Sequence, residues 1–383
     1  MKTEKLYETD AYLRRFSATV LSCAPGKNGF DVVLDRSAFY PEGGGQPGDS
    51  GTLDAVAVTD TRAADGVILH CCTGPLPVGA AVTGEIDWER RFDRMQQHSG
   101  EHIVSGLICA ALHCSNVGFH MGADTVVIDF DAPMTQTQLE EIEAAANRVI
   151  WENRPFLVSY PTAEALDSLE YRSKKELSGE VRIVECPGAD RCACCGTHVR
   201  AAGEIGLIRL IGMKPFRAGV RIEMLAGQRA YRWCCAMTAQ NSRVSALLSA
   251  KPGETAAAVE RMQQELADTQ YRLVGMENRL FAARAEALAG RGDTLLFAEP
   301  MRPDALRRFC DAVGARCGGR CAVFSGDDAE GWKYALRLPA GDLRAFVSGM
   351  NTALRGRGGG KDGFAQGSVG ASRSEIEAFF TAL

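Results

Sequence analysis

Short apolar runs separated by turn residues fill the chain between residues 17 and 88. The runs are rich in valine, threonine and other strand-forming side chains, and glycine, proline, asparagine or aspartate stand between them; they occupy residues 18–23, 30–35, 55–61, 66–72 and 80–88. Regular short strands of this kind predict a small β-barrel or sandwich over residues 1–90.

A helical pattern begins near Arg90, where Met95, Ile103 and Leu107 recur at helical offsets. Strands are expected again at 122–131, followed by an amphipathic helix at 135–154 and by mixed strands and loops at 181–226. This order predicts an α+β domain over residues 91–240, directly after the barrel.

A heptad pattern follows in the segment 241–290, which we expect to be helical. Apolar or small residues alternate three and four apart at Val259, Met262, Leu266, Thr269, Leu273, Met276, Leu280, Ala283 and Ala287. Such a seam either packs on the protein's own core or forms a coiled coil or helical hairpin, and the second reading predicts a homodimer through the C-terminal half. Alternating strand and helix patterns after Gly290 predict a small α/β domain over residues 291–383.

Composition narrows the class of protein. The N-terminus lacks the apolar core of a signal peptide, and no run of 18 or more apolar residues occurs, so we expect a cytoplasmic protein without a membrane span. The 14 cysteines are then expected to be reduced, which favours metal binding or burial over disulfides. A net charge of −5 argues against indiscriminate coating of nucleic acid but permits a local basic patch for one defined RNA.

Two short motifs carry metal-binding chemistry. In "HSGEH", His98 and His102 are four residues apart and share one helical face; in "CACCGTHV", Cys194 and His198 have the same spacing. Imidazole and thiolate both suit Zn²⁺, so the two pairs together could complete a four-ligand site. Alternatively they are unrelated, as surface histidines and a buried or redox-active cysteine cluster. Cys192 and Cys195 leave the identity of the cysteine ligand open at this point.

The first motif also fits H-x-x-E-H, the pattern of inverted zinc peptidases, with Glu101 as general base. That hypothesis needs a distant glutamate as third ligand and leaves the Cys194–His198 pair without a role. We therefore rank it second.

Two glycine-rich stretches are candidates for ligand binding. Gly43, Gly44 and Gly45 expose backbone that a ligand can approach, although a hairpin or bulge would need the same flexibility. Arg355, Arg357 and Lys361 are interleaved with glycines in a predicted basic loop, which either cradles phosphate or is an ordinary solvated loop.

Together these stretches resemble parts of alanyl-tRNA synthetase. "HSGEH" and "CCGTHV" are similar to the zinc motifs of its editing domain, and "DRSAFYPEGGGQPGDSG" (residues 35–51) to the glycine-rich motif of the preceding barrel. "AGVRIEMLAG" resembles the strand that closes the editing domain, and "GRGGGKDGFAQGS" the signature of the C-terminal DHHA1 domain. Because the barrel begins almost at residue 1, the chain looks like a free-standing editing protein of the AlaX family in its long form.

The resemblance implies a function and a set of site residues. Such proteins hydrolyse mischarged tRNA-Ala in trans, chiefly the seryl ester and sometimes the glycyl ester, at a zinc site. Carried over by position, the ligands are His98, His102, Cys194 and His198, and Cys195 stands where the family usually has glycine. The implied substrate-binding residues are Ser37, Gly43, Gly44, Gly45 and Gln46, with Ser37 replacing a more usual threonine as the hydroxyl that recognises serine.

Position along the motifs suggests further candidates for catalysis and for tRNA binding. Glu101 is a candidate general base, or an acceptor that holds a ligand imidazole, and His120 aligns roughly with a polar position near the substrate pocket. Arg355, Arg357 and Lys361 are candidates for tRNA binding. A tRNA-binding module whose zinc is only structural is the third functional reading, after the editing hydrolase and the zinc peptidase.

Overall fold

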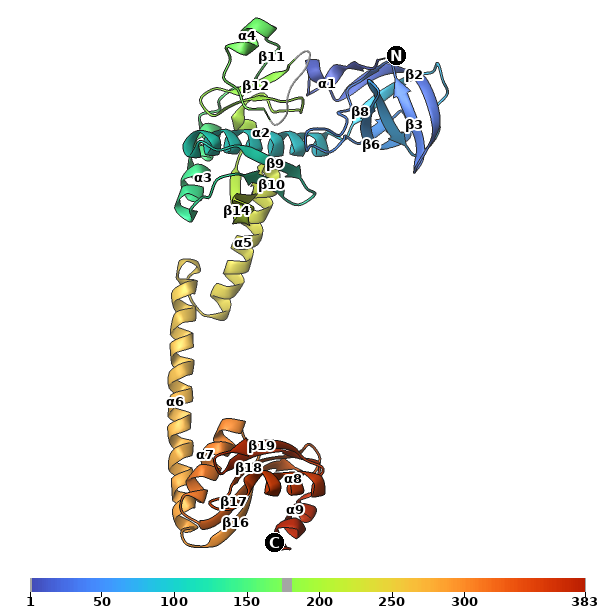
Figure 1. The fold of residues 1–383 in the computed structure, drawn as a ribbon. Coiled ribbons are helices and arrows are strands. Elements are labelled where there is room, and N and C mark those ends of the chain that lie inside the picture. The colour runs from blue at the N-terminus through green and yellow to red at the C-terminus, as the bar shows by residue number, and fades with distance from the viewer. Residues whose placement is uncertain (1, 174–180, 383) are drawn as a thin grey trace. The chain divides into compact units, whose positions relative to one another are not determined.

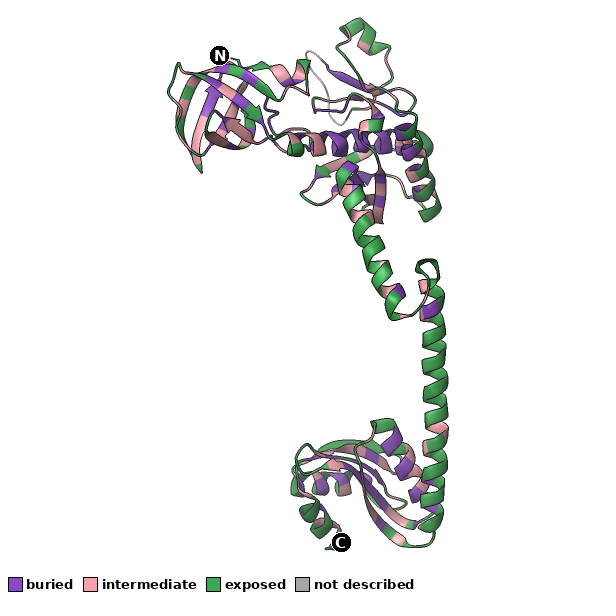
Figure 2. Cartoon of the chain, turned by 180° about the vertical axis from the view of Figure 1, so that it is seen from behind, coloured by how far each residue is buried: buried purple, intermediate pink, exposed green. Residues whose placement is uncertain are grey.

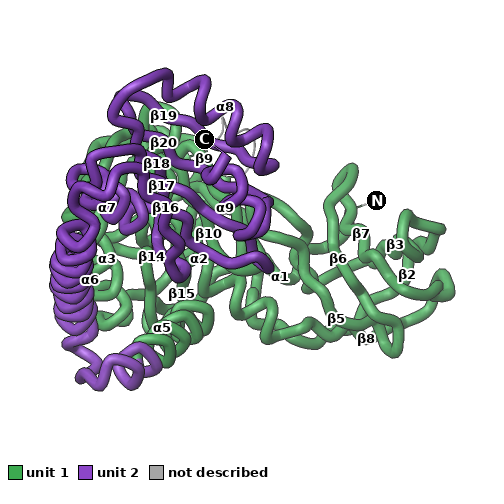
Figure 3. Tube along the Cα trace, turned by 90° about the horizontal axis from the view of Figure 1, so that it is seen from below, with its two compact units in different colours: residues 1–241 green, residues 242–383 purple. Residues whose placement is uncertain are grey.

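The computed structural model describes residues 2–173 and 181–382 and separates the chain into two units, residues 1–241 and 242–383 (Figure 3). The predicted α+β class is confirmed, since helices and mixed sheets occur in both units. The finer division at residues 90, 240 and 290 stays a prediction. Within the described residues, no helix is both long and apolar enough to cross a membrane.

Six strands in the first unit close into a barrel (Figure 1). Around the ring they are β2 (Arg15–Gly26), β3 (Gly29–Leu34), β7 (Val67–Cys72), β6 (Val56–Ala64), β5 (Gly51–Leu53) and β8 (Ala81–Ile86). Alternate residues point inward, and Val20, Val32 and Val82 contribute to the buried core. Each of the five predicted runs overlaps one of these strands, whereas β5 lies outside all of them.

Helix α2 (Trp88–Leu112) leads out of the barrel into the second half of this unit. Asp87 caps it by accepting from the Arg90 backbone N–H. From Arg94 to Gly106 every residue of α2 is buried, which Figure 2 shows as a purple stretch. Many of these buried side chains are polar, and a polar group inside a protein requires specific partners. The helix is therefore built around the site described below, as well as around its apolar face.

Two sheets and a helix surround α2. The larger sheet has the order β14 (Ile208–Phe216), β15 (Gly219–Ala226), β10 (Val126–Phe130), β9 (Asn116–Met121), all antiparallel. The smaller consists of β11 (Leu157–Ser159), β12 (Ile183–Cys186) and β13 (Asp190–Ala193). Helix α3 (Gln136–Trp151), with a Thr135 capping box, packs its apolar side into the same core as α2 and β10.

Short elements complete this half of the unit. They are α4 (Ala163–Asp167) and the 3₁₀ turn η1 (Ala202–Glu204). At the N-terminus, β1 (Glu4–Lys5) pairs in parallel with β4 (Arg36–Ser37) and continues into α1 (Leu6–Thr9). The sequence pattern did not predict β1 or α1.

The predicted heptad segment consists of separate helices. Helix α5 (Gly227–Leu247) ends before the 3₁₀ turn η2 (Pro252–Glu254), and α6 (Thr255–Ala287) follows. Along α6 the seam residues Met262, Leu266, Leu273, Met276 and Leu280 are between 45% and 61% exposed within the chain. Within the second unit the seam therefore does not pack on the core, and its use for dimerisation stays a prediction.

The second unit is a five-stranded sheet in the order β16 (Gly292–Ala298), β17 (Gly318–Asp327), β18 (Gly331–Arg337), β20 (Phe364–Val369), β19 (Arg357–Lys361). Its helices are α7 (Pro303–Gly314), α8 (Leu343–Ala353) and α9 (Arg373–Thr381). Val323 packs with α7, whereas its neighbour Phe324 packs with α8 and α9, as strand alternation requires. The unit is thus an α/β layer structure, as predicted.

Candidate metal centre and its pocket

Four side chains from the two predicted motifs converge in the first unit. His98 and His102 project from α2, and Cys194 and His198 come from the loop after β13. Their candidate ligand atoms all lie within 4.8 Å of one another. Cys194 Sγ lies 3.5 Å from His98 Nε2 and 3.4 Å from His198 Nε2. Residues almost a hundred positions apart therefore form one cluster, largely buried.

Each imidazole is held through its other ring nitrogen. His98 Nδ1 lies 2.8 Å from Gln46 Oε1, and His102 Nδ1 lies 3.0 Å from Asp190 Oδ2. An amide oxygen and a carboxylate only accept, so both Nδ1 atoms donate a proton to these partners and the Nε2 atoms are the candidate metal ligands. His198 Nδ1 lies 3.1 Å from Ser99 Oγ. This pattern of partners orients imidazoles as metal ligands.

Asp190 is anchored from its far side. Arg172 donates to its two carboxylate oxygens at 2.7 and 2.9 Å. Burial by itself raises the pKa of Asp190, but His102 and Arg172 outweigh burial and lower it, so the carboxylate stays ionised. The buried carboxylate therefore presents a fixed negative charge to His102.

The charges within the cluster oppose one another strongly. Burial raises the pKa of Cys194, but the three neighbouring imidazoles outweigh it and hold the pKa well below its usual value. Burial lowers the pKa of His102, yet Cys194 and Asp190 raise it to about 9. Burial, with His102 and His98, lowers the pKa of His198 to about 3. The arrangement stabilises a thiolate at Cys194 and a neutral ring at His198, whereas the proton held by His102 would be released when a metal ion binds.

The cluster fits zinc. With Zn–S near 2.3 Å and Zn–N near 2.0–2.1 Å, a tetrahedral site has sulfur–nitrogen edges of about 3.5 Å. The two measured Sγ–Nε2 distances, 3.5 and 3.4 Å, match that edge. The donor set of one thiolate and three imidazoles is also one that zinc favours.

A pocket of 440 Å³ opens onto the cluster. His98, His102 and Cys194 form part of its wall, and the glycine-rich stretch forms another part through Tyr40 and residues 43–45. Gly44 and Gly45 have φ values of 59° and 85°, so side chains would be strained there. A Cβ on Gly45 would also lie 2.5 Å from the Phe119 ring. Glycine therefore lets this loop reach the pocket wall.

Gln46 ties the glycine loop to both zinc motifs. Its Oε1 accepts from His98 and from the Thr197 backbone N–H at 3.3 Å, and its Nε2 donates to Thr197 Oγ1 at 2.9 Å. The side chain is fully buried and does not line the pocket. Gln46, predicted to contact substrate, is placed as a positioning residue for His98.

Comparisons with known proteins agree with this geometry. A family model described as tRNA synthetases class II (A) matches residues 7–90, and one described as Threonyl and Alanyl tRNA synthetase second additional domain matches residues 181–223. The Alanyl-tRNA editing protein Aarsd1-A of Xenopus laevis is 28% identical over 392 residues, covering 97% of this chain and 95% of its own. The chain resembles the alanyl-tRNA editing proteins. Aarsd1 of Mus musculus is 26% identical over 394 residues, with 97% and 96% covered.

A longer relative shares the same region. The Alanine--tRNA ligase of Thermofilum pendens is 31% identical over 407 residues, which cover 100% of this chain but 44% of the ligase. The resemblance predicted from the motifs is therefore confirmed over nearly the whole chain, both to editing proteins and to part of the ligase.

Ser37 lies elsewhere than the resemblance to the editing family implied. Its side chain is fully buried, its Oγ lies 2.7 Å from His70 Nε2, and it also accepts from the Phe39 backbone N–H. Burial lowers the pKa of His70 to about 4, so the ring is neutral. Ser37 does not line the pocket described here. In this structure its hydroxyl contacts His70 and the Phe39 backbone, and its role in recognising a serine ester stays a prediction.

His120 also does not line the pocket, although the sequence predicted it near the substrate. It lies on β9 with an exposed side chain, and its neighbour Phe119 lines the pocket. Successive strand residues point to opposite faces, so only one of the two can face the pocket. Phe119 stacks on His98 with ring centroids 5.3 Å apart. Phe119 therefore lines the pocket described here, and His120 does not.

Glu101 is not placed as a general base. Its carboxylate accepts from Ser105 Oγ at 2.7 Å and from Asn116 Nδ2 at 2.8 Å, and the residue is 1% exposed. It does not line the pocket, and the Nδ1 atoms of the ligand imidazoles have the other partners named above. The geometry thus gives no support to the H-x-x-E-H peptidase hypothesis.

Several residues of the site were missed by sequence reasoning. Asp190 and Arg172 lie outside both motifs, and Ser99 lies inside the first motif but contacts His198 of the second. Gly196 was also missed, although a Cβ there would lie 2.1 Å from His98 Cε1. Its position between Cys194 and His198, inside the second motif, was an available signal.

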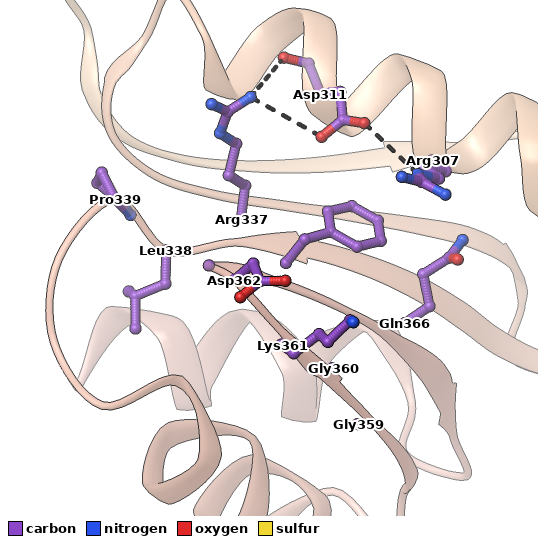
Figure 4. A pocket seen from close by; sticks show the side chains of 12 residues that line it. Arg307, Asp311, Arg337, Leu338, Pro339, Gly359, Gly360, Lys361, Asp362 and Gln366 are labelled. Carbon is purple, nitrogen blue, oxygen red and sulfur yellow. Dashed lines mark hydrogen bonds and ion pairs between the residues drawn. The ribbon is translucent and has the colours of Figure 1, made fainter.

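Of the three basic residues predicted to bind tRNA, two are exposed on a strand and one forms an ion pair. The predicted loop is a hairpin of β19 and β20, with Arg357 and Lys361 exposed at the two ends of edge strand β19. Arg355 instead pairs with Glu375 at 2.7 Å. Lys361 lines a 690 Å³ pocket in which Figure 4 shows Arg307 and Arg337 both directed at Asp311.

Proposed function

We propose that this protein hydrolyses mischarged tRNA-Ala in trans, cleaving the ester that joins a wrong amino acid to the terminal ribose. Seryl-tRNA-Ala is the main proposed substrate and glycyl-tRNA-Ala a second. One observation carries the proposal: the His98, His102, Cys194 and His198 cluster borders a pocket in a chain similar to alanyl-tRNA editing proteins over 97% of its length. The cytoplasm, where tRNA is charged, is the proposed location.

The pocket suits a small ester. Its 440 Å³ lies within the range of small-molecule sites, about 300–1,000 Å³. Phe119 provides an apolar wall, and the glycine loop offers backbone groups without side-chain cover. Tyr40 donates its hydroxyl proton to Gly43 O at 2.9 Å, which leaves the phenolic oxygen able to accept.

The residues around the cluster prepare it for hydrolysis. When bound, Zn²⁺ would supply a Lewis acid that polarises the ester carbonyl and lowers the pKa of water. Gln46, Asp190 and Ser99 fix the three imidazoles, and Gly196 donates its backbone N–H to Cys194 Sγ at 3.3 Å. These contacts keep the thiolate and the Nε2 atoms in place without rearrangement during the reaction.

A separate editing pocket is needed because a synthetic site sorts alanine poorly from serine or glycine. Differences as small as one methylene or hydroxyl contribute only about 1–3 kcal/mol of discrimination in such a pocket. A pocket that hydrogen-bonds the seryl hydroxyl discriminates better, since alanine leaves that partner unsatisfied. We assign this role to Tyr40 and the backbone of the glycine loop.

The second unit supports tRNA binding in this proposal. Arg357 and Lys361 are exposed at an edge strand whose glycines leave the backbone open, so they are the proposed phosphate contacts. Arg355 is proposed to stabilise the fold through Glu375.

The decisive experiment is a deacylation assay with seryl-, glycyl- and alanyl-tRNA-Ala. We expect release of serine, and more slowly of glycine, with alanyl-tRNA spared, and we expect prior removal of metal by a chelator to stop the reaction. The matched control is the chelated protein resupplied with Zn²⁺. Tight tRNA binding without turnover at micromolar protein would instead favour a binding module with a structural metal.

A further inference from the structure

The N-terminal segment β1–α1 forms a wall with a different cavity on each side. Tyr7 points inward and packs edge-on against the Tyr40 ring, with centroids 5.4 Å apart and planes at 80°, and Tyr40 lines the metal pocket. Lys5 and Glu8, on either side of Tyr7 in the sequence, line a second cavity of 830 Å³. A four-residue helix thus separates the two spaces.

The second cavity combines cations with an aromatic surface. Lys2 and Lys5 line it from the N-terminal segment. Val158 on β11 and Tyr160 just after it line it as well, and each is 45% exposed. Its one charged acidic residue, Glu8, is bound to Lys5 at 2.9 Å. Exposed aromatic rings beside lysines are what proteins use to bind single-stranded nucleic acid, by base stacking and phosphate neutralisation.

The two cavities share this short wall. Lys5 and Glu8 line the second cavity, and Tyr7 between them packs on Tyr40 of the metal pocket. An RNA strand whose 3′ end enters the metal pocket can therefore continue past α1 into the second cavity.

We propose that this second cavity binds the single-stranded nucleotides that precede the aminoacylated end of the tRNA. Tyr160 stacks on a base, and Lys2 and Lys5 neutralise phosphates. The inference rests on the proposed function, because it assigns the strand that follows the ester. Glu8 competes with phosphate for Lys5 and so limits the affinity.

The test measures KM and kcat of the full-length protein on two esters, seryl-tRNA-Ala and 3′-O-seryl-adenosine, which lacks the preceding nucleotides. We expect Tyr160→Ala to raise KM for the tRNA by roughly tenfold, the scale of one lost base stack, with kcat nearly unchanged. KM for seryl-adenosine should not change. Tyr160→Phe keeps the ring and should behave like the unmodified protein.

Variants that change charge give a second test, because removal of a lysine and removal of Glu8 should affect KM for tRNA in opposite directions. Lys2→Ala and Lys5→Ala should each reduce the salt dependence of log KM for tRNA by about 0.7, the value per phosphate on a single strand. Glu8→Gln should lower KM for tRNA, because it releases Lys5, and general destabilisation cannot produce that gain. Lys27→Ala, an exposed lysine in the β2–β3 turn of the barrel, is the matched control.

The outcomes separate the two proposals. If the unmodified protein hydrolyses neither ester, the proposed function is wrong. If it hydrolyses seryl-tRNA-Ala but Tyr160→Ala matches Lys27→Ala, or raises KM equally for seryl-adenosine, the function stands and the nucleotide subsite is wrong.

Discussion

Replacing Cys194 by alanine should abolish the retention of zinc and lower kcat/KM for seryl-tRNA-Ala by at least roughly 100-fold. This loss is larger than the effect of removing a residue that only hydrogen-bonds a metal ligand. Cys194 Sγ is the atom that two of the imidazoles approach within 3.5 Å, and their positive field holds it as a thiolate. Without it, three crowded imidazoles lack the negative charge that balances them. Metal content by atomic emission and deacylation by filter assay measure the two effects.

Cys195→Ala is the control for this variant, because it removes the neighbouring thiol, which is not among the four clustered residues. It should keep its zinc. Loss of metal in Cys195→Ala with retention in Cys194→Ala would show that the ligand had been misassigned.

Glu101→Gln should keep most of the deacylation activity, whereas an H-x-x-E-H peptidase would lose all activity on this substitution.

Replacing Asp190 by asparagine should weaken zinc binding by about 10–100-fold, the usual effect of removing the residue that holds a ligand histidine. The neutral amide cannot supply the charge that raises the pKa of His102, and its side chain can turn its NH₂ group toward the imidazole. Competition with a chromophoric chelator measures the affinity without reference to catalysis.

Asp129→Asn is a matched control within the same unit. Asp129 accepts two hydrogen bonds from Arg221, at 2.6 and 2.7 Å, much as Asp190 does from Arg172, but it contacts no ligand. Both variants should lose comparable stability in urea unfolding, and only Asp190→Asn should lose zinc. Equal zinc affinities in the two variants would contradict the positioning role of Asp190.

Local patterns were sufficient for much of the fold. The barrel strands show short strand-type runs bounded by turn residues, and α2 shows an apolar stripe, because each buries one face. His98 and His102 could be paired from spacing alone, since four residues nearly complete a helical turn. Cys194 and His198 lie almost a hundred residues further along the chain, so no local pattern places them beside these histidines. Their meeting was predicted from the resemblance and from the chemistry of zinc.

Ser37 and His120 were expected near the substrate but do not line the pocket. A sequence specifies the direction of a side chain only weakly, except where residues alternate regularly along a strand. Ser37 and Tyr40 are three residues apart in one motif, yet one points into the barrel and the other to the pocket. Phe119 and His120 differ by one strand position and therefore by one face of the sheet. The partners Asp190 and Arg172 were missed because they belong to neighbouring strand and bridge positions that no spacing rule connects.

The hydrogen bonds of Gln46 imply that the barrel and the part of the first unit that holds the metal-ligand cluster are not interchangeable. One amide group joins the glycine loop of the former to a histidine and a threonine of the latter. A chimera that takes its barrel from a distant relative would place the glycine loop slightly differently against His98 and Thr197. Such hybrids should fold and yet hold their metal poorly, so evolutionary exchange of either half is constrained by a single side chain.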